Sequence, residues 1–120
     1  MKNIIPLLLV ALSSYAQINP NNILIARDVW GVPHIFGKTD PEVAYGLAWA
    51  HAEDDFKTIQ LTLLAGKGML GQLNGKDGAS IDYVVGLLRT KEIAAEKMPT
   101  LSSKFMAVAN AYLQGINRYA

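Results

Sequence analysis

The chain has 120 residues, the size of one small domain, and its 11 basic and ten acidic residues nearly balance. This balance gives no sign of nucleic-acid binding, which requires a concentrated basic surface. The chain has no cysteine, which excludes a disulfide, a thiolate metal site and a cysteine nucleophile within these residues. Many small exported domains depend on disulfides, so this chain must depend on its core or on further protein.

Residues 1–16 have the pattern of a secretory signal peptide. Lys2 supplies a positive start, residues 4–12 are an apolar run broken only by a proline, and Ser14-Tyr15-Ala16 has the small-x-small pattern of a cleavage site. The run is too short for a transmembrane helix, and the alternative is a buried N-terminal helix or strand. We therefore predict an exported protein, periplasmic or secreted. Its mature part, residues 17–120, would lose Lys2 and carry equal numbers of basic and acidic residues.

Two short strands are predicted after the polar lead-in of residues 17–22. Residues 23–26 are apolar and include two β-branched isoleucines, and residues 29–36 can form a second strand. Pro33 cannot donate to a sheet ladder, so it favours an edge position or a bend. Gly31 and Gly37 are turn-forming residues that mark the two ends of this second segment.

A long helix is predicted next. Thr39 or Asp40 can cap it, Pro41 suits its first turn, and Thr39-x-x-Glu42 has the spacing of a capping box. Gly66 or Gly68 is expected to end it. Apolar residues recur at steps of three and four and therefore share one face, namely Tyr45, Trp49, Ala52, Phe56, Ile59 and Leu63.

The remaining sequence predicts two more helices. Residues 69–79 are expected to form a helical turn and then a loop, with Asn74-Gly75 and Asp77-Gly78 as turn pairs. A second helix is predicted from Ser80 or Asp82 to about Lys97, and Pro99 stops it. A third follows from Leu101, with apolar residues at helical spacing: Phe105, Val108, Tyr112, Ile116 and Tyr119.

The fold class that follows is α+β, a short strand pair followed by about three helices. The helix faces are strongly apolar, so the chain looks like a piece of a larger layered structure. Standing alone, it is expected to expose a contiguous apolar patch and to be aggregation-prone or molten.

The only two histidines, His34 and His51, are candidates for metal ligands. A metal site would require them to converge with a carboxylate among Glu53, Asp54 and Asp55. The second histidine of an HExxH motif is missing one turn after His51. The sequence therefore favours a structural, hydrogen-bonded role for His34.

Asp54 is the carboxylate that stands out, because it lies on an otherwise largely apolar helical row. A buried carboxylate needs a paired charge or several donors, and Arg27 is the natural partner. The preferred interpretation is a structural ion pair, and the alternative is a general base. The serines offer no nucleophile, since Ser80, Ser102 and Ser103 lack a G-x-S-x-G context and an S-x-x-K motif.

Four ordered blocks of sequence together resemble the penicillin acylase family, a branch of the N-terminal-nucleophile hydrolases. The first two blocks are similar to its R-D-x-x-G-[VI]-P-H-I strand and Y-G-x-[AG]-x-A-x-A-[QE]-D helix. The other two, "GKGMLGQLNG" and "YLQGINRYA", resemble a later turn and helix of the family. The residues that carry the resemblance, and that it suggests are structural, are Arg27, Asp28, Gly31, Pro33, His34, Tyr45, Gly46, Ala52, Asp54, Gly115 and Asn117.

The resemblance implies an αββα layered fold, of which residues 17–120 would be the incomplete amino-terminal portion of the α chain. Members of the family are exported precursors, or zymogens, that cut themselves into an α and a β chain. The first residue of the β chain is a serine, whose hydroxyl is the nucleophile and whose own α-amino group is the base. The resemblance therefore implies no catalytic residue in this segment.

The resemblance also implies the partners: the β chain and a small N-acyl substrate, either a β-lactam side chain, an acyl-homoserine lactone or an acylated peptide. The calcium ligands and most acyl-pocket residues of the family come after the equivalent of Ala120, so calcium is expected only in the full-length protein. Two departures leave the subgroup, and hence the preferred acyl chain, open. Asp55 stands where many members have arginine, and the usual glutamate of the third block is Gln72 or absent.

Overall fold

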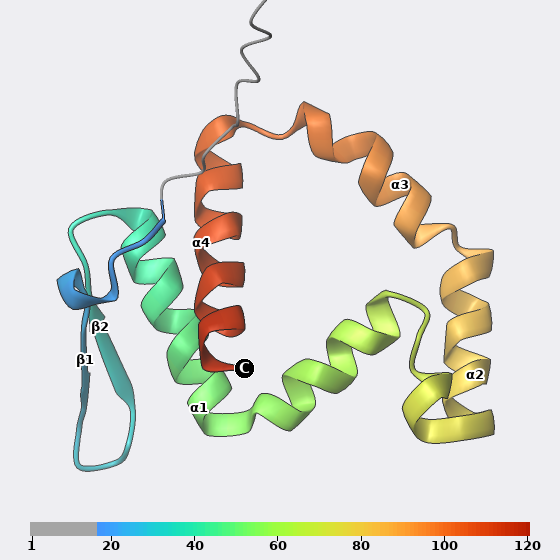
Figure 1. The fold of residues 1–120 in the computed structure, drawn as a ribbon, viewed down its shortest axis with the longest axis horizontal. Helices are drawn as coiled ribbons and strands as arrows, with labels where there is room; N and C mark the ends of the chain where they lie inside the picture. Colours follow the sequence, from blue (N-terminus) through green and yellow to red (C-terminus); the bar gives the residue numbers. More distant parts are fainter. Residues whose placement is uncertain (1–16) are drawn as a thin grey trace, which may run out of the picture.

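The computed structural model describes residues 17–120, so the signal peptide predicted at residues 1–16 lies outside the described residues. A hairpin is followed by four helices arranged as an open hoop (Figure 1). The elements are η1 (Pro20–Asn22), β1 (Leu24–Arg27), β2 (Pro33–Phe36), α1 (Asp40–Gly66), α2 (Gly71–Leu87), α3 (Thr90–Lys97), η2 (Met98–Thr100) and α4 (Ser103–Tyr119).

The predicted strand pair is confirmed as an antiparallel hairpin, in which Ile25 lies opposite Ile35 and Arg27 opposite Pro33. The second strand begins at Pro33 rather than at Val29. Residues 28–32 form the hairpin loop instead, because the Asp28 N–H donates to the Val32 carbonyl at 3.2 Å. In a two-stranded sheet every strand is an edge, which is where a proline is tolerated.

The predicted capping box of α1 is present. The Glu42 N–H donates to Thr39 Oγ1 at 3.3 Å, and the Glu42 carboxylate accepts from the Thr39 N–H at 3.0 Å and the Lys38 N–H at 2.7 Å. The hydrogen bond from Lys38, followed by those from Asn22 and Thr39, holds the pKa of Glu42 below its ordinary value. The first turn of α1 is therefore defined by its own sequence.

Replacing Thr39 by alanine is expected to loosen this first turn by about 1 kcal/mol, the usual cost of losing an N-cap. The Glu42 amide should then exchange its hydrogen about fivefold faster. Hydrogen exchange resolved to single amides measures the change. Thr39→Ser keeps the acceptor oxygen and serves as the control, and equal exchange in all three proteins would contradict the prediction.

α1 is divided by a break at Asp55, which has φ −156° and ψ 71°. The Asp55 carboxylate accepts from the Thr58 N–H at 3.1 Å and from the Thr58 hydroxyl at 2.6 Å, so it caps the second half of the helix. These hydrogen bonds lower the pKa of Asp55. The predicted apolar face is therefore only partly buried: Tyr45 and Ala52 are buried, whereas Leu63, beyond the break, is 43% exposed.

The core lies where the first half of α1 packs against α4. Ala48, Ala52 and Ile116 form its buried centre, and Phe56, Ile59 and Tyr112 pack around them. The helices approach closely at Gly115, where an added Cβ would lie 2.5 Å from the Tyr45 carbonyl oxygen and 2.8 Å from Ala48 Cβ. The hairpin covers another side of α1, and α4 lies across α1 from it (Figure 1).

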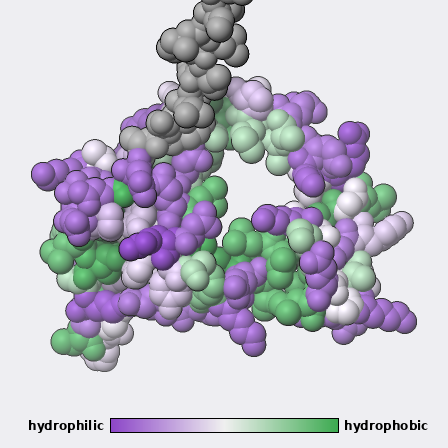
Figure 2. Space-filling model, viewed as in Figure 1, coloured by the Kyte–Doolittle hydropathy of each residue, from purple (hydrophilic) through white to green (hydrophobic). Residues whose placement is uncertain are grey.

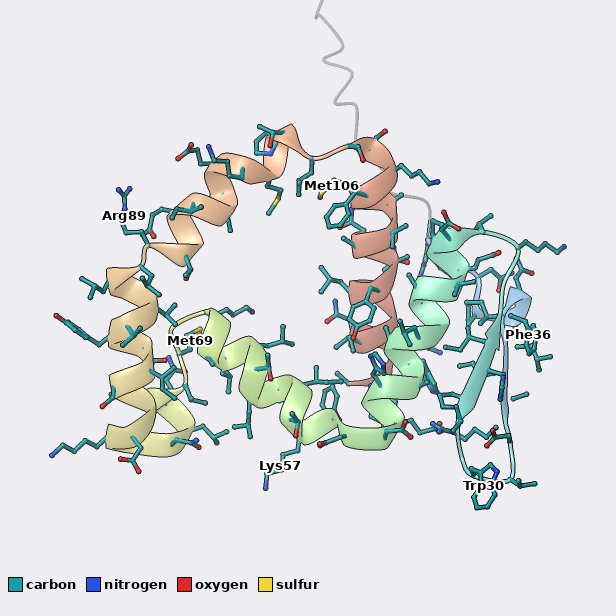
Figure 3. All side chains as sticks on the ribbon, turned by 180° about the vertical axis from the view of Figure 1, so that it is seen from behind. Trp30, Phe36, Lys57, Met69, Arg89 and Met106 are labelled. Atoms are coloured by element: carbon teal, nitrogen blue, oxygen red, sulfur yellow. The ribbon has the colours of Figure 1, made fainter. Side chains whose placement is uncertain are left out.

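The prediction for residues 69–97 was wrong in two respects. α2 begins at Gly71, turns at Gly75 (φ 59°, ψ −134°) and then continues through Asp77-Gly78, which the sequence assigned to a turn. The predicted single helix to Lys97 is also split, because Arg89 adopts φ 54° and separates α2 from α3. Four helices result instead of about three (Figure 3 labels Arg89).

A contact between distant residues explains the early start of α2. The Asp82 carboxylate accepts from the N–H groups of Leu70 and Gly71, both at 2.8 Å, and so caps the first turn of α2 from its later half. Gly78 is buried against Leu70, since an added Cβ there would lie 2.5 Å from the Leu70 carbonyl oxygen. Neither contact follows from local propensity.

Among the described helices, none combines the length and the apolarity needed to cross a bilayer.

Candidate functional site

The signature residues of the hairpin meet α1 through Arg27, the last residue of β1. One guanidinium nitrogen donates to the Gly31 carbonyl at 2.8 Å, and the other donates to Glu53 at 2.8 Å and to Asp54 at 2.7 Å. The hydrogen bond from Glu53, followed by that from Asp54, raises the pKa of Arg27. The side chain thus links the hairpin loop to the first half of α1 by charge-assisted hydrogen bonds.

The ion pair between Arg27 and Asp54 is present, but the buried setting predicted for Asp54 is wrong. The Asp54 side chain is 52% exposed and that of Glu53 is 51% exposed. Two other members of the Asp54 row, Val43 and Leu47, are 37% and 38% exposed, whereas Ala50 on the same row is buried. Glu53 is a second partner of Arg27 that the helical-row argument did not identify.

Asp28 organises the hairpin loop. Its carboxylate oxygen Oδ1 accepts from the Trp30 N–H at 2.8 Å and the Val32 N–H at 3.0 Å, while His34 Nε2 lies 3.5 Å from Oδ2. Gly31 completes the loop with φ +81°, a conformation that residues with a Cβ rarely adopt. The signature positions Arg27, Asp28, Gly31 and His34 therefore share one small network.

The hydrogen bond from the Val32 N–H, with that from Trp30 and the neighbouring His34, lowers the pKa of Asp28. A carboxylate with a lowered pKa stabilises the folded loop fully above the ordinary aspartate pKa of about 3.9, and this contribution is lost as the pH falls through the lower folded value. We expect the Trp30 and Val32 amide resonances to shift together over that acidic range. NMR titration measures this, and Asp28→Asn, which keeps an acceptor oxygen, should abolish the shift. A titration unchanged by Asp28→Asn would contradict the prediction.

The signature residues of the helices lie elsewhere. Gly46 allows the hairpin to approach α1, since an added Cβ would lie 2.6 Å from Ile35 Cγ2. Tyr45 is buried and lines a groove of about 660 Å³ together with Asn117, which is itself exposed, and Arg118. Ala52 belongs to the core. The structure thus brings the hairpin residues together with Asp54, and Tyr45 together with Asn117, but it does not join the two groups.

The remaining candidates have contacts within the fold. His51 Nδ1 lies 3.0 Å from the Tyr112 hydroxyl, on the α1–α4 side, away from His34. Within residues 17–120, no three histidine, aspartate or glutamate side chains gather closely enough to hold a metal ion. The Ser80 hydroxyl donates to the Lys76 carbonyl at 3.3 Å, and Ser102 accepts from the Phe105 N–H at 3.2 Å as the N-cap of α4.

Besides Glu53, sequence reasoning missed three residues that shape the helices. Asp55 had a local signal, because Asp55-x-x-Thr58 has the N-cap spacing of a helix start. Asp82 had none, since it caps residues 11 and 12 positions away. Arg89 also had none, because a left-handed residue at a helix end is usually glycine.

Comparison with known proteins matches residues 22–120 to the family model of penicillin amidase. The penicillin acylase 2 proenzyme of Pseudomonas sp. (strain SE83) is 25% identical over 97 residues, which are 81% of this chain and 12% of that protein. An acyl-homoserine lactone acylase QuiP of Pseudomonas putida is 24% identical over 98 residues, 82% of this chain and 12% of that protein. The penicillin G acylase of Escherichia coli is 23% identical over 109 residues, 91% of this chain and 13% of that protein.

The chain thus spans about an eighth of the length of these curated relatives. The family model covers nearly all of the described residues, including the hairpin, α1 and α4, in which the signature residues lie. The chain belongs to the penicillin amidase family.

Proposed function

We propose that residues 17–120 are the amino-terminal part of the α chain of an exported acylase. This acylase would hydrolyse a linear amide bond in an N-acyl substrate such as a penicillin or an acyl-homoserine lactone. The family assignment carries the proposal, and the relatives named above are penicillin and acyl-homoserine lactone acylases. The name proenzyme of one relative supports a precursor that is cut after synthesis.

In this proposal the reaction is performed by a serine at the start of a β chain, outside these 120 residues. Its α-amino group, with an unperturbed pKa of about 7.7–8.0, would take the proton from its hydroxyl. Hydrogen-bond donors would then stabilise the oxyanion formed at the attacked carbonyl. The hydroxyls of Ser80 and Ser102, by contrast, are engaged with the backbone groups of Lys76 and Phe105.

The signature residues would act as scaffold. Arg27 ties the hairpin loop to α1, Asp28 and Gly31 shape that loop, and Gly115 lets α4 lie against α1. None of these residues needs to touch a substrate to fulfil this role. The hairpin and the α1–α4 pair would form one rigid edge of a larger layered fold.

A second candidate is a truncated exported protein that binds or persists without catalysis. The absence of a catalytic constellation among the described residues favours it for the 120 residues taken alone. The two candidates differ in one respect that is easy to test, namely whether a β chain is encoded.

The first experiment is to sequence the source DNA beyond codon 120. An open frame of several hundred codons with a serine at a processing junction is expected, and its product should release the acyl group from an N-acyl substrate. Residues 17–120 expressed alone are the control and should be inactive. A stop codon directly after Ala120 would overturn the acylase proposal and leave the non-catalytic alternative.

A further inference from the structure

α3 is a helix without a partner among the described residues. It has eight residues, none of which is buried, and Ile93 and Met98 at its end are 50% and 52% exposed. Helices shorter than about 12 residues are marginal in water unless an apolar face is covered. A further packing surface is therefore required to keep α3 helical.

The uncovered side of α3 forms a groove of about 710 Å³ with the end of α1. Figure 2 shows hydrophobic surface beside the opening that the four helices surround. The lining of the groove is mostly apolar, with Met69, Ala94, Ala95 and Met98, and it includes two lysines, Lys67 and Lys91.

One wall of the groove is held in place by contacts already described. The Asp82 carboxylate accepts a hydrogen bond from the Leu70 N–H and so holds Leu70, which directly follows Met69, at the start of α2. The left-handed conformation of Arg89 sets the direction in which α3 leaves α2. The Met69 N–H also donates to the Leu64 carbonyl at 2.9 Å, so the end of α1 is closed against this turn. These contacts therefore fix the side of the groove at the end of α1, whereas the α3 side depends on what covers it.

We propose that this groove holds an amphipathic segment of the same precursor, from the part that follows Ala120. Its apolar side would lie on Met69, Ala94 and Met98, and an acidic residue at its edge would lie near Lys67 and Lys91. This inference rests on the proposed function, because it needs a longer precursor. The chain covers only 12% to 13% of its relatives, so most of a protein of that length would be available to cover the groove.

A second copy of the chain fits the groove less well. In a two-fold dimer the same surface patch contacts itself, so Lys67 and Lys91 of both copies would be brought to one interface. Like charges placed together at an interface are unfavourable. A segment of the same polypeptide also has the advantage of a high effective concentration.

The test places the photo-crosslinking residue p-benzoylphenylalanine at Ala94 in the full-length protein. Glu96, which is on the same helix but outside the groove and exposed, is the matched control position. Mass spectrometry should find peptides from beyond residue 120 joined to position 94 at a yield at least about tenfold above that at position 96. If the protein does not accumulate with the probe at Ala94, Met98 is the second groove position.

The proposal would be overturned if the groove position crosslinked to residues 17–120 of a second copy or to another protein. It would also be overturned if the crosslinking yield at the groove position equalled the yield at Glu96. An acylase assay on the unlabelled full-length protein separates this outcome from a failure of the proposed function. An active enzyme without the crosslink refutes only the proposed occupant of the groove. An inactive protein with the crosslink refutes only the proposed acylase reaction.

Discussion

Replacing Gly115 by alanine is expected to destabilise the contact between α1 and α4 by about 1–3 kcal/mol, the usual cost of overpacking a close contact. The sign of this change in stability is informative, because replacing glycine by alanine inside a helix normally stabilises the helix by about 1 kcal/mol. At Gly115 the new methyl group would lie 2.5 Å from the Tyr45 carbonyl oxygen, which belongs to the backbone of α1 and cannot rotate away. Hydrogen exchange of the α1 and α4 amides measures the loss.

Gly86→Ala in α2 is the matched control for Gly115→Ala. Nothing lies within 4 Å of a Cβ added at Gly86, so only the gain in helix propensity remains. We expect slower exchange in the last turn of α2 for this variant. If Gly115→Ala also slowed hydrogen exchange in the α1 and α4 amides, the close approach of the two helices at that glycine would be contradicted.

Residues 17–120 expressed alone are expected to unfold without a single cooperative transition and to bind a hydrophobic dye. The physical reason is the amount of uncovered apolar surface beyond the break at Asp55 (Figure 2). Large apolar side chains there are 47% to 68% exposed: Leu73, Ile81, Val84, Leu87, Leu88, Ile93 and Met98. Amides of α2 and α3 should exchange faster than those in the contact between α1 and α4.

Thermal unfolding followed by circular dichroism, together with the dispersion of amide NMR signals, tests this expectation. The comparison is the full-length protein, in which the same helices should be protected. A sharp transition with well-dispersed signals for residues 17–120 would show that the open hoop is stable without further protein. That result would also remove the requirement for a partner at α3.

Local chemistry made the start of α1, its buried face and one ion pair predictable. The capping box at Thr39 and Glu42 requires only four consecutive residues, and it begins α1 where expected. The apolar spacing of Tyr45 and Ala52 correctly predicted the buried face of α1, because a helical period places such residues on one side. The pairing of Arg27 with Asp54 could be predicted from charge and from the order of the elements.

The rest depended on contacts between residues far apart in the sequence. The exposure of Asp54 could not be predicted from its apolar row, since burial requires a neighbour that packs on that row. The start of α2 at Gly71 depends on a carboxylate 11 residues later, and its end depends on an arginine in a left-handed conformation. The family signature itself contains both residues whose role follows from the local sequence and residues whose role depends on distant contacts.

The sequence by itself determined the family, the strand pair, the start of α1 and the apolar faces of α1 and α4, because each depends on residue types at short, regular spacings. Only the tertiary structure decided where α1 breaks away from α4, how α2 begins and which apolar faces stay uncovered. Burial is a property of two surfaces. One chain can supply an apolar face, but only a second surface packed against it removes that face from water.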